Sequence, residues 1–244
     1  MTYCVAMALE QGLLFASDSR TNAGVDHIST FSKMHLFEVA GERQLVLLTA
    51  GNLATTQSVV SLLRQRWAHD GIGLRGVSSL YDAALLIGDT VREVIARDVS
   101  EQGTTQGIDY GASFLLGGQI KGEQPRLFNI YPQGNFIESS VETPYFQIGE
   151  SKYGKPILDR VVQFSTPLNE ALKCTLISFD STIRSNLSVG LPIDTLTCKR
   201  DAFVPPKPYR VTETDPYFNQ IRKSWGRGLR KVFTQLPDGA WFER

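Results

Sequence analysis

The second residue of the chain is a threonine, and this position offers chemistry that an internal threonine lacks. A hydroxyl is a weak nucleophile unless a base lies within hydrogen-bond reach. Once Met1 is removed, the free α-amine of Thr2 is such a base, because its reference pKa of about 7.7–8.0 leaves it partly neutral at neutral pH. Thr2 is therefore a candidate N-terminal nucleophile. The alternative is that Thr2 is simply the second residue of the chain.

Two charged residues further along the chain are candidates for activating Thr2. Asp18 follows the apolar run at residues 13–16, which we expect to form a hairpin with a strand at residues 2–9. This hairpin would return Asp18 to the Thr2 end, and Lys33 opens a third expected strand that could reach the same point. A lysine beside Thr2 would lower the pKa of the hydroxyl and the amine, and Asp18 would keep Lys33 charged and oriented. The alternatives are a turn acid and a solvated strand end.

Gly51 lies where an expected strand at residues 45–49 gives way to a helix. Backbone N–H groups at a helix N-terminus point outward and carry partial positive charge. The Gly51 N–H could therefore stabilise an oxyanion. A turn glycine is an equally common explanation.

The hydrophobic periodicity predicts runs of strands that alternate with runs of helices. The expected helices cover residues 52–69, 79–101, 152–162, 168–187 and 215–233. Strands are expected at residues 2–9, 13–16, 33–39, 45–49, 113–120, 126–131, 135–138, 145–148 and 193–199. Short connections make the strands antiparallel. This order predicts the α+β class, with two antiparallel sheets face to face between helices in a four-layer αββα sandwich. Residues 1–203 form the expected main domain, and residues 204–244 form a C-terminal extension with a basic amphipathic helix.

Composition narrows the range of functions. Lys+Arg and Asp+Glu are both 25, so the net charge is zero, which argues against a general nucleic-acid binder. Three scattered cysteines indicate free thiols in a reducing compartment and fit no zinc motif. The first residues lack a basic region followed by an apolar stretch, so we expect no signal peptide, and no apolar run reaches membrane-spanning length. We expect a cytoplasmic protein with no metal and no cofactor.

Taken together, these residues resemble the proteasome β-subunit family of N-terminal-nucleophile hydrolases. The resemblance rests on Thr2, the Ala16–Arg20 segment, Ser32-Lys33-Met34 and the Ala50-Gly51 pair that opens a helix. The long C-terminal segment is most similar to the bacterial ancestral-β-subunit branch (Anbu). The resemblance implies a threonine-type peptidase with the N-terminal-nucleophile fold.

The resemblance also assigns roles to single residues. It implies Thr2 as nucleophile, Asp18 and Lys33 as the activating pair, and Gly51 as oxyanion donor. The family has a serine near the nucleophile amine and an aspartate late in the fourth helix. Ser151 and Asp180 match those two places. Ser151 could instead cap the helix that follows it.

The resemblance implies assembly as well. Related subunits enclose their active sites, so we expect a homo-oligomer, either a ring or an open helical assembly, that acts on peptides or unfolded proteins. Apolar stripes on the expected helices at residues 52–69 and 79–101, with Trp67, are candidate interfaces. The basic cluster of the last helix could contact an acidic neighbour; it consists of Arg222, Lys223, Arg227, Arg230 and Lys231. Any unfoldase would be a separate protein.

Two alternatives remain open. The chain could be a catalytically silent structural subunit with the same fold, because a fold does not imply activity. The segment from Gly149 to Lys155 also has the spacing of a phosphate-binding loop, which would imply a nucleotide-binding protein. In that segment, however, Pro156 stands where the motif requires a serine or threonine for Mg²⁺.

Overall fold

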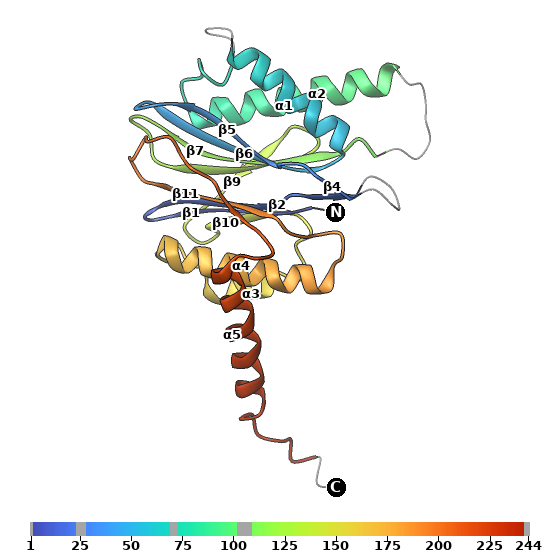
Figure 1. Ribbon diagram of the computed structural model, residues 1–244. Coiled ribbons are helices and arrows are strands. Elements are labelled where there is room, and N and C mark those ends of the chain that lie inside the picture. The colour runs from blue at the N-terminus through green and yellow to red at the C-terminus, as the bar shows by residue number, and fades with distance from the viewer. Residues whose placement is uncertain (1, 23–27, 69–72, 102–108, 242–244) are drawn as a thin grey trace.

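The chain folds into four layers, in the order helix, sheet, sheet, helix (Figure 1). The computed structural model describes residues 2–22, 28–68, 73–101 and 109–241. The first sheet has the order β10-β1-β2-β11-β12, and the second sheet has the order β5-β6-β7-β8-β9. Every neighbouring pair is antiparallel. This architecture confirms the predicted α+β sandwich.

The strands and helices have the following bounds. The first sheet contains β1 (Tyr3–Leu9), β2 (Gly12–Asp18), β10 (Tyr145–Gly149), β11 (Ile193–Lys199) and β12 (Tyr209–Val211). The second sheet contains β5 (Met34–Val39), β6 (Arg43–Gly51), β7 (Ala112–Ile120), β8 (Arg126–Ile130) and β9 (Phe136–Glu138). A two-stranded ribbon, which the sequence did not predict, contains β3 (Arg20–Asn22) and β4 (Ile28–Thr30). The helices are α1 (Leu53–Trp67), α2 (Leu80–Glu101), α3 (Lys155–Val161), α4 (Leu168–Ser185) and α5 (Pro216–Phe233).

Strand β1 shows how one sequence supplies two cores. Successive side chains of a strand point to opposite faces. Tyr3 and Val5 face α3 and α4, whereas Cys4 and Ala6 enter the space between the two sheets. Since both faces of each sheet are covered, the central strands have almost no polar positions.

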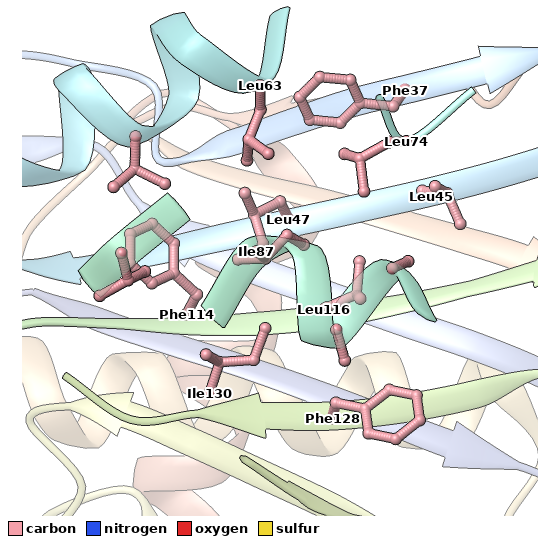
Figure 2. Close-up of a cluster of buried hydrophobic side chains, with 14 of the residues drawn as sticks. Phe37, Leu45, Leu47, Leu63, Leu74, Ile87, Phe114, Leu116, Phe128 and Ile130 are labelled. Atoms are coloured by element: carbon pink, nitrogen blue, oxygen red, sulfur yellow. The ribbon is translucent and has the colours of Figure 1, made fainter. Parts of the chain in front are cut away.

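The helices α1 and α2 cover the outer face of the second sheet. Figure 2 shows the core between these helices and the sheet, where Ile87 of α2 lies over Leu47 and Leu116 of the sheet. Trp67 packs against this core, with its ring centroid 5.6 Å from that of Phe37. The apolar stripes that we expected to serve as interfaces are therefore mainly used by the chain's own core.

Residues 204–244 contribute to the first sheet and then leave the body of the molecule. β12 pairs with β11, with Val211 opposite Ile193. Asp215 caps α5 by accepting a hydrogen bond from the Phe218 N–H at 2.7 Å. Phe218 and Ile221 are buried, but the second half of α5 projects away from the sandwich (Figure 1). No helix in the described parts of the chain has the length and apolar character needed to cross a membrane.

Candidate active site

The first sheet fixes the position of Thr2 through its backbone. Thr2 directly precedes β1, and its carbonyl oxygen accepts a hydrogen bond from the Glu150 N–H at 2.6 Å. Gly149 lies against Thr2 with a φ of +80°, and a Cβ on Gly149 would stand 2.0 Å from the Thr2 carbonyl oxygen. Only glycine allows this close approach. Thr2 is thus held at the start of a central strand.

Asp18 and Lys33 form a buried ion pair next to Thr2. The Lys33 Nζ lies 2.7 Å from the Asp18 Oδ1, and the two residues are 6% and 0% exposed. The same Asp18 oxygen accepts a hydrogen bond of 3.0 Å from the backbone N–H of Tyr3. Lys33 also donates to the carbonyl oxygen of Arg20 at 2.7 Å. The pair is therefore connected to the residue that follows Thr2, and the ammonium group is fixed by two acceptors.

Burial governs the charge of this pair. Removal from water raises the pKa of Asp18 above its ordinary range, and the Lys33 cation and the Tyr3 N–H lower it again in part. Lys33 is hydrogen-bonded directly to Asp18, so its cation opposes the effect of burial on the carboxylate. This arrangement holds a lysine side chain close to the candidate nucleophile Thr2.

The two residues that follow Thr2 are poor candidates for a nucleophile. Burial raises the pKa of the Cys4 thiol and of the Tyr3 hydroxyl, so both stay protonated. Cys4 is completely buried, and its Sγ lies 3.6 Å from the carbonyl oxygen of Thr49. This contact joins β1 of the first sheet to β6 of the second.

Gly51 ends β6 on the side of the molecule that holds Lys33. The Thr49 N–H donates to the Lys33 carbonyl oxygen at 3.0 Å, which ties this end of β6 to the ion pair. Gly51 has a φ of +109°, and Asn52 caps α1 with its side chain. The structure thus brings Thr2, Asp18, Lys33 and the Gly51 turn to one end of the two sheets.

Glu150, the residue before Ser151, is hydrogen-bonded to the Thr2 carbonyl oxygen through its backbone N–H. The Glu150 carboxylate accepts hydrogen bonds from the Asn186 side chain at 2.9 Å and from the Lys152 N–H at 3.0 Å. Ser151 lines a groove with Tyr145 and Lys155, on the β10 edge of the sheet. Neither Glu150 nor Asn186 was identified from the sequence. The sequence signal that could have identified Glu150 is its position directly after Gly149. We had matched this segment to the serine that the family has near the nucleophile amine.

Asp180 lies apart from this group. Its two carboxylate oxygens contact Arg222 at 2.7 Å and Arg184 at 3.0 Å. In the described parts of the chain no hydrogen bond joins Asp180 to Thr2, Asp18 or Lys33. We therefore leave Asp180 out of the proposed catalytic group.

The segment from Gly149 to Lys155 does not have the geometry of a phosphate-binding loop. β10 pairs antiparallel with β1, whereas such loops follow a parallel strand. The Glu150 carboxylate lies within the segment, and α3 has only seven residues with Pro156 in its first turn. A carboxylate at this place repels phosphate, so the geometry argues against nucleotide binding.

Comparisons with known proteins agree with one another. The family model described as "Proteasome subunit" matches residues 2–190. An ancestral β-subunit (Anbu) structure from Yersinia bercovieri is 62% identical, with a TM-score of 0.92 and 98% of each chain covered. The helical assembly of the Anbu complex from Pseudomonas aeruginosa is 57% identical, with a TM-score of 0.94 and 98% of each chain covered.

A third similar structure is Anbu from Hyphomicrobium sp. strain MC1. It is 48% identical with a TM-score of 0.90, and the match covers 98% of this chain and 99% of that one. No curated protein matches the chain significantly.

Proposed function

Since the chain belongs to the proteasome subunit family, we propose that it is a threonine-type peptidase whose nucleophile is Thr2 after removal of Met1. Met1 itself lies outside the described residues. The observation that carries the proposal is the buried Lys33–Asp18 pair, which is bonded through Asp18 to the backbone N–H of Tyr3. Burying two charges is costly and is often not stabilising. A reactive group beside the pair would explain why these two charges are buried.

The proposed reaction uses residues at one end of the sheets. The Thr2 hydroxyl attacks the carbonyl carbon of an amide bond, and its proton passes to the α-amine. The Lys33 ammonium favours the developing alkoxide, and Asp18 holds that ammonium in place. The Gly51 N–H donates to the oxyanion. The amine then protonates the leaving group, and water hydrolyses the resulting ester.

The substrate class and setting are parts of the same proposal. An amide hydrolase with an open site would act on peptides or unfolded protein segments. We propose a homo-oligomer that encloses the sites, in line with the helical assembly of the relative from Pseudomonas aeruginosa. Three free, buried cysteines are consistent with a reducing, cytoplasmic location. A separate unfoldase would unfold folded proteins and supply them as substrates.

Mass analysis of the N-terminus combined with active-site labelling tests the proposal. We expect the purified protein to begin at Thr2 and to react with a peptide epoxyketone, which needs both the hydroxyl and the free amine of an N-terminal threonine. Thr2→Ala should abolish labelling, while Thr214→Ala, which removes an exposed hydroxyl between β12 and α5, should retain it. Equal labelling of Thr2→Ala and the parent protein would overturn the proposal.

One observation favours a second candidate, a catalytically silent subunit. The residue whose N–H contacts Thr2 is Glu150, and its carboxylate is occupied by Asn186 and Lys152. The resemblance led us to expect a serine hydroxyl near the amine. A protein that begins at Thr2 but reacts with no threonine-directed electrophile would support the silent subunit.

A further inference from the structure

Three consecutive residues of α4 connect this helix to two neighbours. Two of them contact Tyr3 of β1, and the third contacts α5. The Ser178 Oγ lies 2.5 Å from the Tyr3 hydroxyl, and the Phe179 ring centroid lies 4.5 Å from that of Tyr3. The next residue, Asp180, binds the Arg222 guanidinium of α5 at 2.7 Å. Successive helical residues point about 100° apart, so this short segment reaches neighbours on two sides of α4.

The contacts with Tyr3 are buried and specific. Tyr3, Ser178 and Phe179 are fully buried. The Gln147 side chain donates to the Tyr3 hydroxyl at 2.7 Å, which leaves the hydroxyl proton free to be donated to Ser178. A satisfied buried polar network tolerates little displacement, because an unpaired partner would lose its hydrogen bond without gaining water. Movement of this part of α4 is therefore transmitted to Tyr3, the residue next to Thr2.

The C-terminal end of α4 reaches Thr2 by a second route. Asn186 ends the helix, with its N–H donating to the Thr182 carbonyl oxygen at 2.8 Å. Its side chain donates to Glu150 at 2.9 Å, and the Glu150 N–H donates to the Thr2 carbonyl oxygen at 2.6 Å. Thus α4 is connected to Thr2 through Glu150 and to the next residue through Tyr3.

The orientation of α5 is fixed only along its first half. Phe218 and Ile221 are buried in the core that includes α4, and the Arg222 guanidinium lies 5.3 Å from the centroid of the Phe218 ring. Beyond Arg222 the helix projects from the body (Figure 1), and Leu229 and Phe233 are 52% and 74% exposed. A force on the free half of α5 therefore acts on α4 through the Arg222–Asp180 pair.

We infer that Ser178, Phe179 and Asp180 are positioning residues that couple the orientation of α5 to the placement of Thr2. The reactivity of Thr2 then depends on contacts made by α5, far from the nucleophile itself. This inference rests on the proposed function for its effect on reactivity, whereas the structural coupling can be measured independently of it.

The test compares Arg222→Gln with Arg227→Gln in the full-length protein. Both changes remove one cation from α5, but within the described parts of the chain Arg227 has no ion pair with α4. Amide hydrogen exchange is measured for residues 2–9 and 145–151, with β6 as an internal reference. We expect Arg222→Gln to accelerate exchange in both segments about fivefold, a typical size for coupling between sites, and to leave β6 unchanged. Arg227→Gln should match the parent protein, and Arg222→Lys should restore most of the protection.

Electrophile labelling gives the second readout. A positioning role predicts that Arg222→Gln lowers the maximal labelling rate about fivefold while the concentration for half-maximal rate stays constant. If the parent protein is not labelled at all, the proposed function fails, and hydrogen exchange alone decides the coupling.

Ser178→Ala provides an independent variant, because it leaves α5 and its ion pair intact. It should accelerate exchange of residues 2–9 like Arg222→Gln. Exchange indistinguishable from the parent protein in either Arg222→Gln or Ser178→Ala would overturn the inference.

Discussion

The Lys33 side chain is the single group on which the proposed chemistry depends most after Thr2. It is buried, and it donates hydrogen bonds to Asp18 and to the Arg20 carbonyl oxygen. Lys33→Ala should reduce labelling of Thr2 by a factor of roughly 10²–10⁴, the usual scale for losing acid–base assistance. Lys33→Arg should not restore the rate, because a planar guanidinium does not fit the place of a compact ammonium. Lys155→Ala, which removes an exposed lysine, is the control, and a near-normal rate in Lys33→Ala would exclude Lys33 from the site.

His35 makes stability depend on pH. Burial, with the nearby Arg64 cation, lowers the pKa of His35 from 6.5 to about 4. The unfolded chain therefore binds a proton between these pH values that the folded protein does not bind, so the free energy of unfolding decreases as pH falls from 6.5 towards 4. We expect this residue to contribute about 2 kcal/mol to that decrease, after allowance for its partial exposure. Urea unfolding of the parent protein and of His35→Gln at pH 8 and pH 4.5 measures it. Equal losses in the two proteins would contradict the prediction.

At the scale of elements, the two halves of α5 should respond differently to the same substitution. Phe218 is fully buried against α4, whereas Phe233 is 74% exposed on the same helix. Phe218→Ala should lower the free energy of unfolding by about 3–5 kcal/mol, because it leaves a cavity in a packed core. Phe233→Ala should change it by less than about 0.5 kcal/mol under conditions that keep the protein monomeric. Similar losses in both variants would mean that the free half of α5 is packed against the body in solution.

At the scale of the whole molecule, a groove between α4 and α5 leaves apolar side chains exposed. Ile177 of α4 lines a groove of about 480 Å³ with the α5 residues Ile221, Trp225, Leu229 and Val232. Exposed apolar surface of this kind usually marks an interface, and identical chains usually associate symmetrically. We expect a homo-oligomer of at least about six subunits, by analogy with assembled relatives.

Light scattering over a concentration series tests this assembly. Leu229→Glu should shift the protein towards smaller species, because it places a charge in the apolar groove. Val141→Glu, at a position of similar exposure on a distant loop, serves as the matched control. A parent protein that stays monomeric at micromolar concentration would contradict the prediction.

The sequence by itself determined the layered fold and indicated that Asp18 and Lys33 lie together. Period-two patterns and short turns are local signals, so β1, β2, β5 and β6 were predicted to within a few residues. The hairpin of β1 and β2 places Asp18 near Thr2 for the same local reason, and the structure brings Lys33 to that carboxylate. The last helix was also predicted nearly to its observed bounds, because its N-cap residue and its apolar stripe are close together in the sequence.

Only the tertiary structure decided which distant segments meet. The placement of β10 beside β1 and of β11 beside β2 depends on long connections that carry no local signal. Glu150 and Asn186 are 36 residues apart, and Asp180 and Arg222 are 42 residues apart. The residues on either side of an aspartate or glutamate in the sequence do not show whether its carboxylate will contact a nucleophile or an arginine of another helix. Its role is set by the packing of α4 between the first sheet and α5, which no short stretch of sequence encodes.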